Sequence, residues 1–159
     1  MANDGRDPTG LDKLDLKILR SLSEDGRVTW SDLADRIGLT LTPTLKRVRR
    51  LEETGFIQGY TAKLDEARLK GTMVVFVSVT LERQVREALE EFEENIAALP
   101  EVMSGFLMSG GADYLLRVVV RDLEHYRMLL DSITRIHGVA HIQSSFALKA
   151  IVNRSAPMM

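Results

Sequence analysis

The sequence of 159 residues predicts an α+β protein made of two parts. Two patterns predict this class. Apolar residues recur every three or four positions across residues 13–54, which is typical of helices, whereas residues 73–152 alternate between β-branched runs and helical stripes. Because the pattern changes between them, we expect a helical domain at residues 1–60, a linker at 61–71 and a mixed domain at 72–159.

The first two helices have recognisable ends. An apolar stripe repeats at every fourth position over Leu14–Leu22 and predicts a helix that ends near Asp25. Thr29, with Asp32 three residues later, is typical of a capping box that opens a second helix. Gly38 is suited to the left-handed position that closes this helix.

A third helix follows directly. Thr40 is expected to cap it, Pro43 lies in its first turn, where a missing N–H costs little, and Gly55 ends it. Residues 56–64 have strand-like content interrupted by Gly59, which predicts a short ribbon or an extended connection. The three helices in this order, with a short turn before the third, predict a helix-turn-helix that a small wing could extend.

The second part follows the order β-α-β-β-α-β, the ferredoxin-like arrangement, in which two helices cover one face of a four-stranded antiparallel sheet. A turn rich in glycine separates the two central strands. The expected strands are residues 73–81, 102–108, 114–120 and 139–152, and the expected helices are residues 85–99 and 123–133.

The first of these strands is apolar on both sides. Val75, Val77 and Val79 share one side, and Val74 and Phe76 share the other. One layer of helices can cover only one face of a sheet, so the second apolar face is expected to meet the same face of a second copy in a homodimer.

Composition narrows the class of protein. The chain has no cysteine, which excludes disulfides and thiolate metal sites, and its longest apolar run is far below the roughly 20 residues that cross a bilayer. The start of the sequence lacks an apolar export segment. We therefore expect a cytoplasmic protein without a membrane partner.

The third helix holds a basic cluster, although the formal net charge of the chain is −2. At 100° per residue, one side of the helix is apolar and the other carries hydroxyl and cationic groups. The predicted core side is Leu41, Leu45, Val48 and Leu51, and the predicted outer side is Thr42, Pro43, Lys46, Arg47 and Arg50. Such a side fits the major groove of double-stranded DNA, which is about 12 Å wide.

Roles follow from the way such helices dock. Their N-terminal residues meet base edges, which assigns Thr42, Lys46 and Arg47 to bases and Arg49 and Arg50 to phosphates. The alternative is a solvated face partly paired to acidic neighbours. The full set of predicted DNA-binding residues is Thr40, Thr42, Pro43, Thr44, Lys46, Arg47, Arg49 and Arg50. On the extended segment, Gln58, Tyr60 and Lys63 could add backbone contacts, and Trp30 is expected to pack on the helical domain.

Three stretches resemble one family. GLTLTPTLKRVRRLEETGFIQGYTAKL (38–64), SGGADYLLRV (109–118) and SSFALKAI (144–151) are similar to the Lrp/AsnC transcriptional regulators and span nearly the whole chain. The resemblance implies a dimeric or octameric regulator, associated with the nucleoid of a bacterial or archaeal cell. It also implies that the C-terminal domain binds a small amino acid between dimers.

The resemblance also places the effector site, at the turn of residues 108–114 with help from the second helix and last strand. Backbone N–H groups at the glycines could meet a carboxylate, and Asp113 could meet an ammonium group. The alternative is that Asp113 and the glycines only form a tight turn. The implied residues are Leu107, Met108, Ser109, Gly110, Gly111, Ala112, Asp113, Tyr114, Ile133, Thr134, Ser144 and Ser145.

Other classes of function have less support. His125 lies alone on a predicted helix, and Gly138 separates His137 from His141, so no set of side chains that could ligate a metal or act as a catalytic base is expected. We expect no enzyme, no cofactor and no metal. An amino-acid-binding or assembly module without specific DNA binding remains the alternative.

Overall fold

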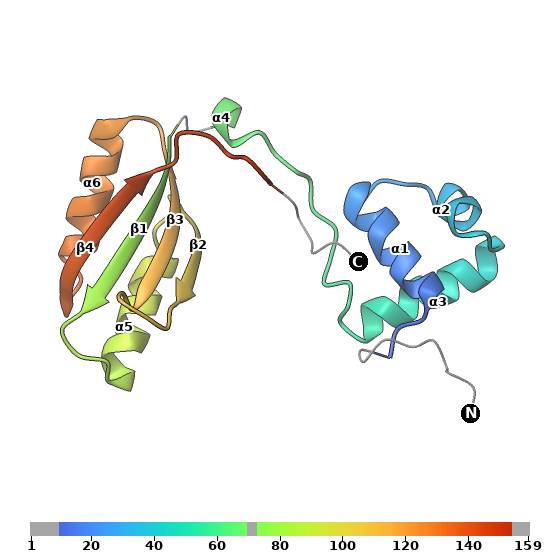
Figure 1. The fold of residues 1–159 in the computed structure, drawn as a ribbon, viewed down its shortest axis with the longest axis horizontal. Helices are drawn as coiled ribbons and strands as arrows, with labels where there is room; N and C mark the ends of the chain where they lie inside the picture. Colours follow the sequence, from blue (N-terminus) through green and yellow to red (C-terminus); the bar gives the residue numbers. More distant parts are fainter. Residues whose placement is uncertain (1–9, 70–72, 154–159) are drawn as a thin grey trace. The chain divides into compact units, whose positions relative to one another are not determined.

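The computed structural model describes residues 10–69 and 73–153. Its described residues divide into two units, one of residues 10–63 with 152–153 and one that runs from Leu64 to Ile151. Figure 1 shows a helical part and a part built on a sheet. None of the described helices is long and apolar enough to span a membrane.

The helical unit contains α1 (Lys13–Glu24), α2 (Trp30–Ile37) and α3 (Leu41–Glu53), close to the predicted bounds. Thr29 caps α2 by accepting from the Asp32 N–H at 3.1 Å, and Gly38 closes it at φ 78°. Thr40 holds the N-cap position of α3, but its side chain makes no capping hydrogen bond.

The buried side of α3 differs from the predicted one. Val48 and Leu51 are buried as expected, whereas Leu41 is 46% exposed and Thr44 is fully buried in its place. Thr44 satisfies its hydroxyl by donating to the Thr40 carbonyl at 2.9 Å. At 100° per residue the buried side is therefore rotated by about 40° from the apolar stripe.

Residues 54–65, which follow α3, form no strand. Of the two structures that the sequence predicts here, the extended connection is present and the ribbon is not. The Tyr60 hydroxyl donates to Glu52 on α3 at 2.9 Å, and the Tyr60 ring meets Trp30 edge-on at 6.4 Å between centroids. A four-residue helix, α4 (Glu66–Leu69), lies within the predicted linker, where no helical stripe is visible.

The second unit has the predicted ferredoxin-like topology. Its sheet order is β2-β3-β1-β4, and all neighbouring strands are antiparallel. The strands are β1 (Met73–Leu81), β2 (Val102–Leu107), β3 (Tyr114–Val120) and β4 (Val139–Phe146), and the helices are α5 (Arg86–Ala97) and α6 (Leu123–Thr134). Strand β4 is shorter than predicted, because its pairing with β1 ends at Phe146, opposite Val75.

Helices α5 and α6 cover one face of the sheet (Figure 1). Val75, Val77 and Val79 of β1 are fully buried beneath them, with Phe92 from α5 and Ile133 from α6. Leu123 of α6, in contrast, is 64% exposed. It is the first residue of the helix, directly after the Asp122 N-cap, and lies beyond the packed turns.

The other face of the sheet is open within the unit. Phe76 and Phe106 lie on it at 39% and 56% exposure. Arg117, which pairs with Phe76 across the strands, forms a two-pronged ion pair with Glu66 of α4 at 2.5 and 3.2 Å. This open sheet face therefore carries exposed aromatic side chains beside polar ones such as Ser78, Gln143 and Ser145.

Candidate nucleic-acid interface and effector turn

The exposed side of α3 carries Thr42, Pro43, Lys46, Arg49 and Arg50. Pro43 lies in the first turn, where its ring displaces no helical hydrogen bond. Neither Lys46 nor Arg49 takes part in an ion pair with another residue that the structure describes. The rotation of α3 turns Arg49 outward and brings Arg47 towards α1.

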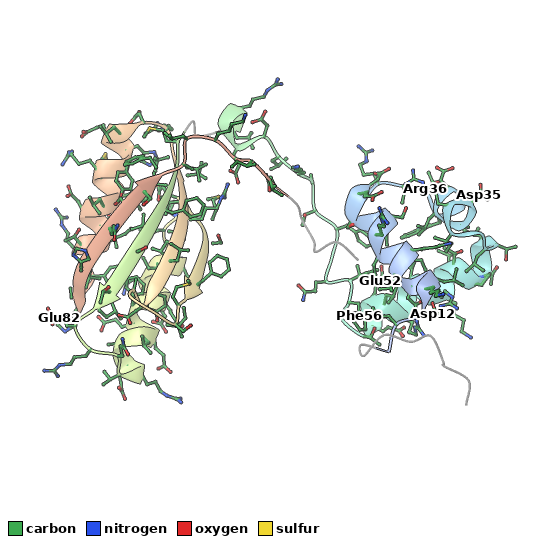
Figure 2. All side chains as sticks on the ribbon, in the orientation of Figure 1. Asp12, Asp35, Arg36, Glu52, Phe56 and Glu82 are labelled. Carbon is green, nitrogen blue, oxygen red and sulfur yellow. The ribbon has the colours of Figure 1, made fainter. Side chains whose placement is uncertain are left out.

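Arg47 and Arg50 are held by carboxylates at the start of α1. Arg47 Nη1 donates to Asp12 Oδ2 at 2.6 Å and to Asp15 Oδ1 at 2.8 Å. Arg50 forms an ion pair with the second oxygen of Asp15. Figure 2 shows Asp12 where α1 begins, beside α3. We call these four residues the Asp–Arg cluster.

The acidic side of the Asp–Arg cluster is also the cap of α1. Asp12 accepts from the Leu14 and Asp15 N–H groups at 2.9 Å each, and Asp15 accepts from the Asp12 N–H at 3.1 Å. This reciprocal capping box fixes both carboxylates before they meet Arg47. Burial, the largest single cause, raises the pKa of Asp12. The hydrogen bond from the Asp15 N–H and the contact with the Arg47 guanidinium together lower it by more, so the pKa lies below its ordinary value.

The same contacts also shift the pKa of Arg47. The hydrogen bond to Asp12 raises the pKa of Arg47 above its ordinary value, against the opposing effect of burial. Arg47 therefore stays charged at any physiological pH. Its side chain is only 27% exposed, compared with 51% for Arg50.

The structure places two of the predicted DNA-binding residues at or beside the packed side of α3. Thr44 is fully buried in the helical core, so its side chain cannot reach a ligand, and Arg47 meets α1 rather than pointing straight outward. Thr40 is exposed and contributes its carbonyl to Thr44. The acidic partners Asp12 and Asp15 were missed, although their spacing of three residues is the signal of a capping box.

The predicted effector turn, residues 108–114, follows β2. Its ends are tied by the Met108 N–H, which donates to the Asp113 carbonyl at 2.7 Å, and by the Asp113 N–H, which donates to the Val79 carbonyl at 2.9 Å. Leu107, Met108, Ser109, Gly110 and Gly111 are exposed, whereas Ala112 is half-buried. The turn thus offers backbone and apolar side chains to a ligand.

Asp113 does not offer its carboxylate. It is buried, its Oδ2 accepts from the Leu81 N–H at 2.7 Å, and its Oδ1 accepts from Gln84 Nε2 at 2.6 Å. These contacts fit the turn-forming alternative, because both carboxylate oxygens already accept hydrogen bonds within the fold. Gln84 is a partner that the sequence did not indicate.

The next residue, Tyr114, is buried as well. Its hydroxyl donates to Glu93 at 2.8 Å. Burial first, and Glu93 second, raise the pKa of Tyr114. Tyr114 therefore joins β3 to α5 rather than facing a ligand.

The remaining implied effector residues are dispersed within the unit. Ile133 is fully buried under the sheet, which contradicts a direct ligand contact. Thr134 and Ser144 line a shallow hollow of about 260 Å³ between α6 and β4, where the Ser144 hydroxyl bonds to Tyr126. Ser145 pairs with Phe76 and lies on the open sheet face. One copy of the chain does not bring these groups to the turn.

Potential metal ligands are not clustered among the residues that the structure describes. No group of three or more potential His, Asp or Glu ligands occurs among them. His125 pairs with Glu101 at 2.9 Å on the surface of the second unit, without a third ligand.

Known proteins match both parts of the chain. Residues 74–157 match the Lrp/AsnC ligand binding domain, and residues 11–58 match a winged helix-turn-helix DNA-binding domain. The Bkd operon transcriptional regulator of Pseudomonas aeruginosa is 60% identical over 148 residues, which cover 92% of this chain and 97% of the relative. The leucine-responsive regulatory protein of Escherichia coli K12 is 45% identical over 130 residues, covering 81% of this chain and 79% of that protein.

Solved structures share the fold of the whole chain. A transcriptional regulator from Neisseria meningitidis, solved as a complex with L-Met, has a TM-score of 0.88 at 36% identity, covering 93% of this chain and 97% of that one. Both domains are matched in order, and the curated relatives are regulators of transcription. The chain therefore belongs to the Lrp/AsnC family of transcriptional regulators, in which a helix-turn-helix DNA-binding domain is joined to an amino-acid-binding domain.

Proposed function

We propose that the exposed side of α3 enters the major groove of double-stranded DNA. Thr42, Pro43 and Lys46 then lie near base edges, because they are at the N-terminal end of the helix, and Arg49 lies nearer to phosphates. Arg47 and Arg50 contribute the N–H groups that the aspartates leave unused. The observation that carries this proposal is the division of α3 into a buried side and an exposed side with Lys46 and Arg49.

The effector is an amino acid with an apolar side chain, bound at the turn after β2. Support comes from the exposed Leu107 and Met108, at 63% and 44%, next to glycine backbone that can approach a carboxylate. A related regulator of 36% identity is solved with L-Met, which makes methionine the first amino acid to try. Since Asp113 is committed within the fold, the ammonium group needs an acceptor from a second copy.

The regulator assembles through the open sheet face. Phe76 and Phe106 would be covered by the same face of a second copy, and further association of dimers, up to an octamer, would bring effector turns together. Residues 1–60 then act on DNA and residues 72–159 on effector and assembly. We place this assembly in the cytoplasm, on the nucleoid, with no reaction catalysed.

Linkage explains how the two activities are coupled. An amino acid that prefers one arrangement of dimers changes the spacing of the helix-turn-helix units, and therefore the affinity for a DNA region with several half-sites. The effect is reciprocal, so bound DNA changes the affinity for the amino acid by the same factor.

The experiment selects genomic fragments with purified protein, with and without each of methionine, leucine, isoleucine and valine. The proposal expects a small set of enriched fragments, bound in a salt-dependent way, whose enrichment changes with at least one amino acid. Equal binding of genomic and random fragments would favour the assembly module without specific DNA binding.

A further inference from the structure

Asp15 is a buried carboxylate in a DNA-binding domain, and its partners lie on the recognition helix. Its side chain is 1% exposed and accepts from the Asp12 N–H, from Arg47 at 2.8 Å and from Arg50. Both oxygens are therefore engaged, and two of the three partners are cations of α3. No other arginine pair in the described residues shares one buried acid in this way.

A phosphate cannot readily displace Asp15 from these arginines. Water does not reach the Asp15 carboxylate, so a guanidinium that moved to a phosphate would leave a buried charge without a partner. The free energy lost in this way is far larger than the free energy gained from a new ion pair at the surface. The pairs therefore persist when DNA binds. Arg47 and Arg50 approach DNA in the orientation that Asp15 gives them.

The Asp–Arg cluster is also balanced in charge, with Asp12 and Asp15 facing Arg47 and Arg50. It offers directional N–H donors but little net attraction for phosphates at random positions. The salt-dependent attraction then rests on Lys46 and Arg49. Oriented N–H donors strengthen binding only at sites whose acceptors match them, whereas cations held by no carboxylate attract the phosphates of DNA of any sequence.

We propose that Asp15 is a positioning residue that sets sequence discrimination, because it restrains Arg47 and Arg50 and cancels their attraction for random DNA. This inference rests on the proposed docking of α3. Asp15 itself touches no DNA. Its loss would leave Arg47 held by Asp12 alone and would free Arg50 from its ion pair with the buried acid.

The test compares wild type with Asp15→Asn, which keeps the size of the side chain and removes its charge. Affinity for a selected fragment and for random DNA is measured between low and moderate salt. We expect tighter binding of random DNA, a salt slope for random DNA steeper by about 0.9 per phosphate gained, and a ratio of selected to random binding that falls about tenfold. Asp122→Asn, which removes one charge at the cap of α6, is the matched control and should leave the ratio and slope unchanged.

A second variant covers the case in which Asp15→Asn fails to fold. Arg47→Lys keeps the positive charge and loses the planar fork, so the ratio should fall while the salt slope stays as in wild type. An unchanged ratio in a folded Asp15→Asn or Arg47→Lys protein would overturn the proposal. A wild-type protein that does not prefer the selected fragment, or a Lys46→Ala protein with full affinity, would instead count against the docking of α3.

Discussion

The Tyr60 hydroxyl donates a hydrogen bond to the Glu52 carboxylate at 2.9 Å, while the ring of Tyr60 meets Trp30 edge-on. These two contacts attach the extended segment after α3 to both helices of the helix-turn-helix. Burial, with Glu52 as the second cause, raises the pKa of Tyr60 to about 12. Figure 2 marks Glu52 on α3.

Tyr60→Phe removes this hydrogen bond and leaves the ring in place. We expect a loss of about 0.5–1 kcal/mol in the free energy of unfolding, because the pair is partly exposed. A raised pKa means that the contribution is complete below pH 10 and is lost as the pH rises towards about 12. Urea unfolding, followed through the fluorescence of Trp30, the single tryptophan, measures the difference at several pH values. A gap that stays constant from pH 8 to pH 11.5 would contradict this account.

Asp12→Asn tests the acid side of the Asp–Arg cluster. Asparagine still caps α1 but loses its ion pair with Arg47, so we expect a loss of about 1 kcal/mol at neutral pH. The pKa of Asp12 is lowered from 3.8, so its contribution is present above that value and is lost as the pH falls further. Unfolding curves of both proteins between pH 3 and pH 6 should therefore converge at the acid end. Parallel curves over the whole range would rule out the ion pair as the cause.

Asp113→Ala separates the two interpretations of the effector turn. The Leu81 N–H would lose its acceptor in a buried place, so the second unit should be destabilised by about 1–3 kcal/mol. Asp131→Ala, in an exposed pair with Arg127, is the control and should change the melting temperature little. If Asp113→Ala melted like wild type but lost amino-acid binding, Asp113 would be a ligand residue after all.

Phe76→Asp places a charge in the middle of the open sheet face. Burying that charge against a second copy is unfavourable, so the dimer should dissociate at concentrations where wild type is associated. Sedimentation velocity measures this shift. Leu123→Asp, at a position on α6 that is also exposed and apolar, should sediment as wild type does. A Phe76→Asp protein that remains fully associated would place the interface elsewhere.

Much of the fold was predictable because local signals agreed with tertiary packing. Residues 114–120 were predicted as a strand with the bounds that β3 has, since a turn rich in glycine precedes it. Gly38 was predicted at a positive φ and adopts 78°. In both cases the residues that decide the ends lie beside the element in the sequence.

The candidate interface was predicted less completely. The apolar stripe of α3 pointed to Leu41, but a buried threonine can replace an apolar residue when its hydroxyl bonds to its own backbone, as Thr44 does. The rotation that follows brings Arg47 to Asp15, 32 residues away in the chain. Charge patterns along a sequence do not say which distant carboxylate a cation will meet.

The effector residues show a related limit. The resemblance to a family supplied positions, but the burial of Ile133 and the engagement of Asp113 depend on how β1, β3 and α6 pack. Only the exposed residues of the turn are available to a ligand within one copy. A site completed by a second copy has no signal in the spacing of residues along one chain.

The most direct test of the docking of α3 uses Lys46→Ala and Arg49→Ala, with Lys17→Ala on the exposed side of α1 as the control. Affinity for a selected DNA fragment is measured as a function of salt by fluorescence anisotropy. We predict that each α3 variant binds more weakly and that the slope of log affinity against log salt is shallower by about 0.9 for Arg49→Ala, which loses a phosphate contact, whereas Lys17→Ala matches wild type. Affinities and slopes equal to wild type in both α3 variants would contradict the proposal that this side of the helix meets DNA.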